Sequence, residues 1–152
     1  MKRWERWAFN VSCLVVAITG FAYFWLKYGL QSNDPFAVVN HPWQTPMLDV
    51  HLVASPVFIL VFGIVLNSHV MKKLRAPHLP NRKSGFVSLC TFAAMVVSGY
   101  LLQVNSTEAW LRTLVVLHVG SGTVFSIAYT AHLVVSARLA RDRSDTAIRE
   151  IA

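Results

Sequence analysis

Apolar and charged positions divide this chain into four long apolar stretches joined by short polar segments. The stretches are Trp7–Tyr28, Val50–Met71, Gly85–Val104 and Thr113–Ala137. Only one charged residue, Lys27, lies inside any of them. A helix needs about 20 predominantly apolar residues to cross a bilayer, so each stretch predicts one membrane-spanning helix. We therefore expect an all-α protein, an integral membrane four-helix bundle.

The expected helices leave no room for a second domain. We place them at about residues 7–28, 48–73, 85–104 and 110–139, within a single domain that covers residues 1–152. The first helix follows a short basic segment, as in a signal peptide. Its apolar part is longer than the roughly 7–15 residues of a signal peptide, and no small-residue cleavage site ends it. We expect this helix to be retained.

Composition agrees with a membrane protein and changes the meaning of the net charge. Hydrophobic residues make up 55% of the chain and charged residues 14%, whereas soluble domains carry about 25% charged residues. A net charge of +7 would suggest nucleic-acid binding in a soluble protein. Here the basic residues flank the apolar stretches, so we expect contact with membrane lipid and no nucleic-acid partner.

Lysine and arginine are distributed unevenly between the two ends of the expected helices. Of the 14 basic residues, all except Lys27 and Arg112 lie in the two terminal tails or between the second and third stretches. Lys and Arg concentrate on the cytoplasmic side of membrane proteins. We therefore expect cytoplasmic N and C termini, outward-facing segments 29–48 and 105–112, and a location in the bacterial inner membrane.

Four histidines lie inside the expected spans, where ionisable residues are costly and usually functional. His51 and His69 are 18 residues apart in the second helix, and His118 and His132 are 14 residues apart in the fourth. At 3.6 residues per turn, each spacing is close to a whole number of turns. Each pair therefore shares one face of its helix. We expect His51 opposite His118 near the outer surface, and His69 opposite His132 near the inner surface.

Two stacked pairs of facing imidazoles are the arrangement that bis-histidine ligation of two b-type haems requires. Each iron would take one nitrogen from each helix. Neither Cys13 nor Cys90 belongs to a Cys-x-x-Cys motif, so covalent haem attachment is not expected. The two histidine spacings differ by about one turn, and we expect a kink at Pro56 to absorb the difference.

Three other interpretations of the histidines remain open. They could be polar core residues bonded to hydroxyl or carbonyl groups, ligands of a metal transporter, or members of a proton relay. A purely structural membrane anchor for a larger complex is a further alternative. Relays usually include Asp or Glu, and none occurs inside the four apolar stretches.

Short repeated motifs suggest that the chain consists of two similar helical hairpins. Val61–Ile64 precedes His69 as Val124–Ile127 precedes His132, both in the pattern V-F-x-I-x-x-x-x-H. The first and third helices share a second pattern, Thr-Gly-Phe at 19–21 and Ser-Gly-Tyr at 98–100.

Several residues near the histidines are candidates for contact with a haem. Phe62 and Phe125 each lie seven residues before the inner histidine, on nearly the same face. Gly122 follows His118 by four residues and would leave room for a flat ring; Gly20 and Gly99 could do the same. Lys27 and Arg112 are the basic residues expected on the outer side, where they could pair with haem propionates.

In these features the chain resembles the small di-haem cytochrome b subunits, such as the membrane subunits of formate dehydrogenase and nickel–iron hydrogenase. The resemblance rests on His51, His69 and the segment Leu117–Arg138, in which two histidines 14 residues apart precede an arginine. Two features depart from the family pattern, because the second helix has the longer 18-residue spacing and the first helix contains no histidine.

The resemblance implies two haem b groups and transmembrane electron transfer. Electrons would pass between an extracytoplasmic iron–sulfur or multihaem c-type subunit and the membrane quinone or quinol pool. The chain would then be the electron-transfer subunit of an oxidoreductase complex and not an enzyme alone. The outer segment 31–47 is the expected docking surface for the partner subunit.

Overall fold

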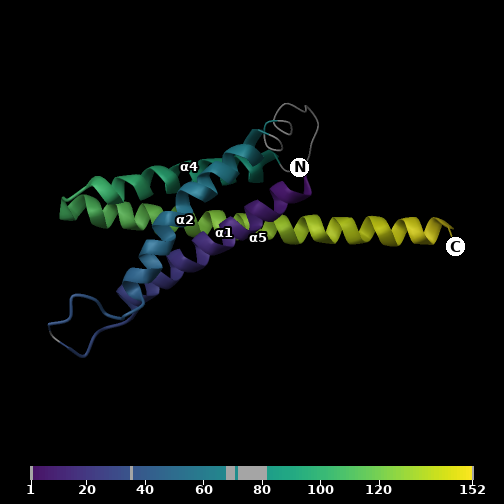
Figure 1. Cartoon of the computed structure of the whole chain (residues 1–152). Coiled ribbons are helices and arrows are strands. Elements are labelled where there is room, and N and C mark those ends of the chain that lie inside the picture. The colour runs from purple at the N-terminus through teal and green to yellow at the C-terminus, as the bar shows by residue number, and fades with distance from the viewer. Residues whose placement is uncertain (1, 35, 68–70, 72–81, 152) are drawn as a thin grey trace. The chain divides into compact units, whose positions relative to one another are not determined.

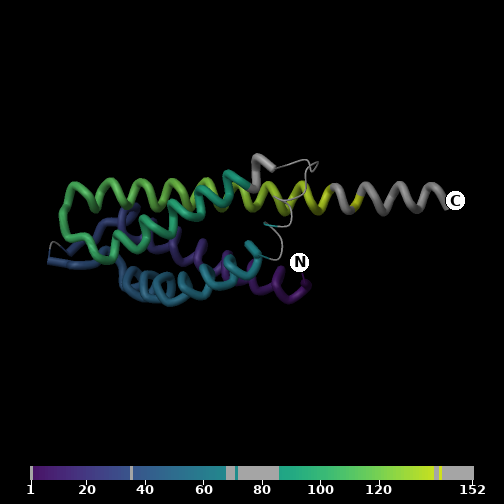
Figure 2. Tube along the Cα trace, turned by 90° about the horizontal axis from the view of Figure 1, so that it is seen from above, coloured from purple at the N-terminus to yellow at the C-terminus, as the bar shows by residue number. Residues whose placement is uncertain are grey.

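The computed structural model describes the whole chain except residues 1, 35, 68–70, 72–81 and 152. The helices are α1 (Arg3–Phe24), extended by the π-helical turn η1 (Trp25–Gly29), then α2 (Gln44–Val65), α4 (Arg82–Val104) and α5 (Glu108–Ile151). No strand occurs among the described residues. The chain forms two compact units, Met1–His78 and Leu79–Ala152, and each unit is a helical hairpin whose helices pack side by side (Figures 1 and 2).

The first hairpin packs α1 against α2 through an aromatic cluster. The ring of Phe9 lies 5.5 Å from that of Phe58 and 6.1 Å from that of Phe62, centroid to centroid. All three side chains are buried. Tilted aromatic pairs at these distances are favourable through contact between the rings, so this cluster holds the two helices in register.

The loop between α1 and α2 is tied back to the ends of both helices. The Asn40 side-chain amide donates a hydrogen bond to the Lys27 carbonyl (2.8 Å), and its backbone N–H bonds to the Gln44 side chain (3.1 Å). An Asx turn at Asp34 accepts the Phe36 N–H (2.9 Å). These bonds satisfy polar groups where the helices end.

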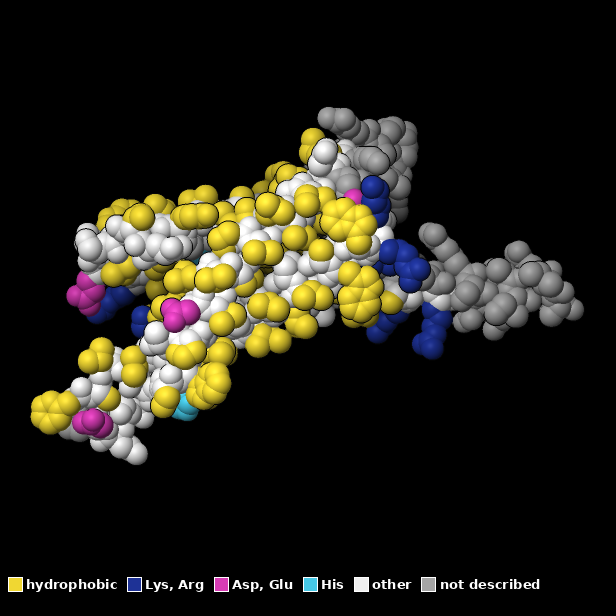
Figure 3. Space-filling model, in the orientation of Figure 1, with side chains coloured by type: hydrophobic (Ala, Val, Ile, Leu, Met, Phe, Trp, Pro, Cys, Tyr) yellow, Lys and Arg dark blue, Asp and Glu magenta, His cyan; other side chains and the backbone are white. Residues whose placement is uncertain are grey.

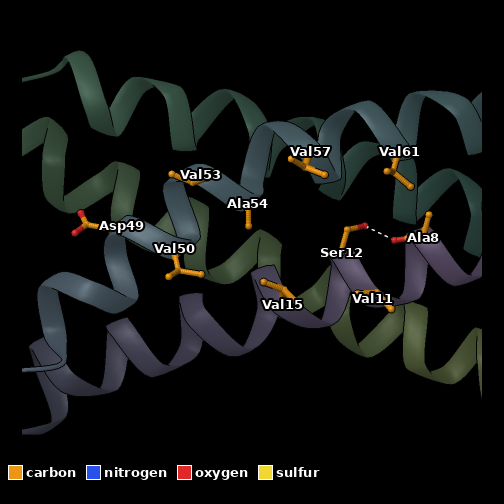
Figure 4. Close-up of a pocket in the computed structure, with 10 residues that line it drawn as sticks. All are labelled: Ala8, Val11, Ser12, Val15, Asp49, Val50, Val53, Ala54, Val57 and Val61. Atoms are coloured by element: carbon orange, nitrogen blue, oxygen red, sulfur yellow. Dashed lines mark hydrogen bonds between the residues drawn. The ribbon is translucent and has the colours of Figure 1, made fainter.

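Helix α2 begins earlier than expected and contains a proline. It starts at Gln44 and not near residue 48. Pro46 does not prevent this start, because the backbone N–H groups of a first helical turn have no partner inside the helix and the missing N–H of proline costs nothing there. Pro56 lies inside the helix, and α2 changes direction along its length (Figures 1 and 4). A proline has no N–H to donate and commonly kinks a helix, in agreement with the prediction.

The second hairpin repeats the same plan with a tighter connection. Phe125 is buried, with its ring centroid 5.9 Å from that of Phe92 on α4 and 6.2 Å from that of Tyr129. An Asx turn at Asn105, which accepts the Thr107 N–H (2.9 Å), joins the helices. Helix α5 has 44 residues and continues well beyond the start of α4 (Figure 1).

Among the described residues, four helices are long and apolar enough to cross a membrane. The candidate spans are Arg3–Gly29, Gln44–Val65, Phe86–Val104 and Glu108–Arg138. Many large hydrophobic side chains are exposed on them, and hydrophobic groups cover much of the helical surface visible in Figure 3. Lipid is the solvent that such surfaces require. The prediction of an all-α multi-pass membrane protein with four long helices is confirmed.

Candidate functional site

His51 is held by a hydrogen bond to the backbone of the neighbouring helix. Its Nδ1 atom lies 3.0 Å from the carbonyl oxygen of Val16 on α1 and 3.3 Å from Thr19 Oγ1. A carbonyl oxygen can only accept, so Nδ1 carries the proton. The Thr19 hydroxyl donates its own proton to the Val15 carbonyl (2.8 Å) and is left to accept from His51. In a neutral imidazole, the lone pair is then on Nε2.

A glycine on α1 lets the His51 ring approach this carbonyl. A Cβ atom built on Gly20 would lie 2.8 Å from His51 Cε1 and 3.1 Å from Nδ1. The first distance is shorter than real Cβ contacts and the second is tighter than most of them, so any other residue would push the ring away. Gly20 comes four residues after Val16 and one after Thr19, and in a helix these three residues share a face.

His118 in the second hairpin has the same environment. Its Nδ1 lies 2.9 Å from the Met95 carbonyl oxygen and 3.4 Å from Ser98 Oγ. Ser98 is fully buried and donates its proton to the Ala94 carbonyl (2.6 Å). A Cβ on Gly99 would lie 3.0 Å from His118 Cε1. Each hairpin therefore combines a carbonyl, a hydroxyl residue, a glycine and a histidine in one arrangement.

This shared arrangement sets the structural register between the two hairpins. It aligns Thr19–Gly20 with Ser98–Gly99, as the shared sequence pattern suggested, and it aligns His51 with His118. Phe58 then corresponds to Phe125, since each follows its histidine by seven residues and each is 3% exposed.

The V-F-x-I motif instead matches Phe62 with Phe125, which is one helical turn out of this register. The motif compares α2 and α5 by sequence alone, whereas the structural register depends on the contacts that His51 makes with α1 and His118 makes with α4. In the structural register, the position that His132 occupies in α5 is taken in α2 by Val65, which is buried.

The aromatic and glycine candidates lie inside their own hairpins. Phe62 packs on Phe9, and Phe125 packs on Phe92 and Tyr129. Gly122 faces α4, where its Cβ would lie 3.4 Å from the Met95 sulfur. These contacts account for the three residues as hairpin packing, and a haem contact for them stays a prediction.

The two basic candidates are engaged near the connection of each hairpin. Lys27 Nζ donates to the Tyr23 hydroxyl (3.1 Å) and lies 5.5 Å from the ring centroids of both Tyr23 and Tyr28. Arg112 forms a salt bridge of 2.6 Å with Glu108 one turn earlier, and both side chains are exposed. An exposed pair of this kind contributes little stability, so Arg112 is available to exchange partners at low cost.

The inner pair of histidines is described only in part. His132 is exposed within the second hairpin, and His69 lies outside the described residues. Within the described part of the chain, no group of three or more His, Cys, Asp and Glu side chains could hold a metal ion. Axial ligation of a haem requires only two such side chains per iron.

Sequence reasoning missed the residues that orient the two histidines. Thr19, Ser98 and the carbonyl groups of Val16 and Met95 were not singled out, although the repeated Ser/Thr-Gly pattern pointed to them. Asp49, in the second turn of α2, lies just before the apolar stretch Val50–Met71.

The chain matches no known protein-family model, no curated protein and no solved structure. The assignment of a function therefore depends on the geometry of the two hairpins.

Proposed function

We propose that this protein is a di-haem b-type cytochrome that transfers electrons across a membrane, related to the small di-haem cytochrome b subunits. One observation carries the proposal, namely the duplicated hydrogen bond from a histidine Nδ1–H to a helix carbonyl. Metal-ligating histidines commonly donate their other ring N–H to a carbonyl or carboxylate, which sets the tautomer and raises the basicity of the ligand. His51 and His118 both meet this condition.

The histidine of each hairpin has the hydrogen bonding and the space that an axial haem ligand requires. The Nδ1–H is engaged, so Nε2 is the nitrogen with a lone pair for iron. Glycine at positions 20 and 99 gives the ring space beside a helix backbone. In the proposal, His51 and His118 hold one haem, and His69 and His132 hold the other. Haem iron would supply reversible one-electron transfer, and the chain's own residues fix the ligand tautomer and orientation.

The proposal also includes an orientation in the membrane and a partner subunit. Both termini would face the cytoplasm of a bacterial cell, and the four helices would form one bundle. This orientation agrees with the basic residues Lys2, Arg3 and Arg6 at the open end of the first hairpin.

The α1–α2 loop would bind an extracytoplasmic iron–sulfur or multihaem c-type subunit. Its Phe36 and Val38 side chains are 90% and 98% exposed, as an apolar docking contact requires.

The absorption spectrum of the purified full chain tests this function directly. We expect reduced-minus-oxidised bands of b-type haem, and about two haems per chain by pyridine haemochrome assay. A matched preparation of a His51→Ala, His118→Ala double variant should lose at least one haem. A colourless protein from haem-replete cells would contradict the proposal, and so would an unchanged haem content in the double variant.

A further inference from the structure

Two tyrosine rings hold the ammonium group of Lys27 near the end of the first candidate span, Arg3–Gly29. The Lys27 Nζ atom donates a hydrogen bond to the Tyr23 hydroxyl (3.1 Å) and lies 5.5 Å from the ring centroids of both Tyr23 and Tyr28. A cation over the face of an aromatic ring is attracted to that face. The ammonium therefore has a defined position, although the side chain is exposed.

The backbone and the rings around Lys27 are also held in place. Lys27 and Tyr28 belong to the π-helical turn η1, and such turns are frequent at functional sites. The Tyr28 ring packs on the Phe24 ring, with 5.1 Å between the centroids. The Asn40 side-chain amide donates to the Lys27 carbonyl (2.8 Å). These contacts join the end of α1 and the α1–α2 loop into one support for the ammonium.

The positive charge of Lys27 has no carboxylate partner within the described part of the chain. Arg112, the other basic residue expected on the outer side, forms a salt bridge with Glu108. Lys27 instead contacts two phenol side chains, which carry no negative charge. An ammonium has three N–H donors, and Tyr23 accepts from one of them. The charge and two donors remain for an anion.

The second hairpin has no counterpart of this cluster. In the structural register that aligns Gly20 with Gly99, the cluster corresponds to residues 102–107, which include no cation and no aromatic ring. Helices α4 and α5 form their hairpin without such a group. The fold of a hairpin therefore does not require the cluster, which favours a role in binding.

The neighbouring side chains indicate which anion is within reach. Trp25 and Tyr28 are 62% and 53% exposed, and exposed Trp and Tyr residues concentrate at the level of the lipid head groups. Phosphodiesters are the anions that a bilayer offers at this depth. The ring faces that border the site already hold the Lys27 ammonium, so a choline or ethanolamine cation would be repelled there. A head group with a phosphate and no cation is favoured.

We propose that Lys27 and Tyr23 bind the phosphodiester of an anionic glycerophospholipid such as phosphatidylglycerol, while Tyr28 holds the ammonium in position. Lys27 donates charge-assisted hydrogen bonds to the phosphate oxygens. The Tyr23 hydroxyl accepts from Lys27 and donates its own proton to the phosphate. The site uses none of the histidines, so it is independent of the proposed electron transfer.

Photolabelling of the full chain in phosphatidylcholine nanodiscs tests this site. The probes are phosphatidylglycerol and phosphatidylcholine with identical acyl chains that carry a diazirine beside the ester, and labels are mapped by mass spectrometry. We expect phosphatidylglycerol to label residues 21–30 about tenfold more than phosphatidylcholine, the ratio that one hydrogen bond to a charged group provides. Lys27→Met should remove this preference and Lys27→Arg should keep it. Labelling of residues 3–11, at the other end of α1, should be the same in all variants.

A matched loss of charge separates a local site from general attraction. Arg112→Gln also removes one positive charge, and we expect it to leave the preference at residues 21–30 unchanged. Equal losses in Lys27→Met and Arg112→Gln would overturn the proposal. Inorganic phosphate should not compete more strongly than chloride at equal ionic strength, and competition by phosphate would show that the site takes free phosphate and not lipid.

Transfer of haem to apomyoglobin is measured in the same variants. We expect Lys27→Met to leave the rate unchanged. Faster loss of haem together with unchanged lipid labelling would assign Lys27 to a haem propionate and overturn the lipid site. A preference for phosphatidylglycerol in a protein without haem bands would contradict the proposed function and leave the lipid site intact.

Discussion

At the scale of single residues, backbone carbonyls and not acidic side chains orient the two central histidines. A helical carbonyl oxygen has two lone pairs, so it can accept from His51 or His118 and still close its own helix. The adjacent hydroxyls of Thr19 and Ser98 donate to their own helices and strengthen the same contact. This arrangement fixes a ring nitrogen without introducing a charge into an apolar span, where a carboxylate would be costly.

Substituting the glycines tests this arrangement. Alanine at Gly20 or Gly99 would place a Cβ at 2.8 Å or 3.0 Å from the histidine ring, so the ring must move away from its carbonyl. We expect Gly20→Ala and Gly99→Ala to speed the loss of haem to apomyoglobin by about tenfold to a hundredfold, the usual effect of disturbing a ligand's supporting contact. Gly63→Ala is the control, since no atom lies within 4 Å of its Cβ position. Equal rates in all three variants would contradict the assigned role.

At the scale of elements, each hairpin is held together by a buried phenylalanine at the same register position. Phe58 and Phe125 are both 3% exposed, and each packs on a ring of the preceding helix. Lipid tails are as apolar as these side chains, so burial from water adds nothing between helices already in the bilayer. The hairpins therefore depend on close packing of the rings.

Removal of one ring should measure this packing. We expect Phe58→Ala to reduce the free energy of unfolding by about 1–3 kcal/mol, less than the roughly 3–5 kcal/mol seen in soluble cores, because only the cavity term remains. Val57→Ala on the same helix is the control: Val57 is 56% exposed and should cost less than about 0.5 kcal/mol. Titration with sodium dodecyl sulfate, followed by circular dichroism, gives both values, and similar losses would disprove the packing argument.

At the scale of the whole molecule, the spans were predictable from apolar runs that contain a single charged residue, but the ends of the helices and the contacts at the site were not. Residues 44–47 were assigned to a loop, although the first turn of a helix can extend beyond the hydrocarbon, and α2 begins at Gln44. Likewise α5 was expected to end near residue 139 and continues to Ile151. Periodicity shows which face of a helix a histidine occupies, but it does not identify the carbonyl of a neighbouring helix. In the sequence, Gly20 and Gly99 were the residues that marked where the histidine rings approach the neighbouring helix.

The proposed orientation in the membrane, which is inferred from the uneven distribution of basic residues, can be tested by cysteine labelling. In a background without Cys13 and Cys90, we expect Phe36→Cys to react with a membrane-impermeant maleimide in intact spheroplasts. Trp4→Cys, in the first turn of α1, should react only after the membrane is permeabilised. Both positions are well exposed, at 90% and 54%, so a difference reports sidedness. The reverse pattern would contradict the cytoplasmic placement of the N terminus.

The proposed sharing of haems between histidines of the two hairpins makes a prediction about haem counts. If His51 and His118 share a haem, His51→Ala, His118→Ala and the double variant should all lose the same haem and retain the other. If each histidine held a separate haem, the double variant would lose two. His132→Ala should remove only the second haem, so that combining it with His51→Ala leaves none. Pyridine haemochrome assays count the haems, and redox titration of the single variants identifies which one remains. Because loss of a shared ligand pair is not additive, a double variant that loses more than either single variant would rule out the pairing across the hairpins.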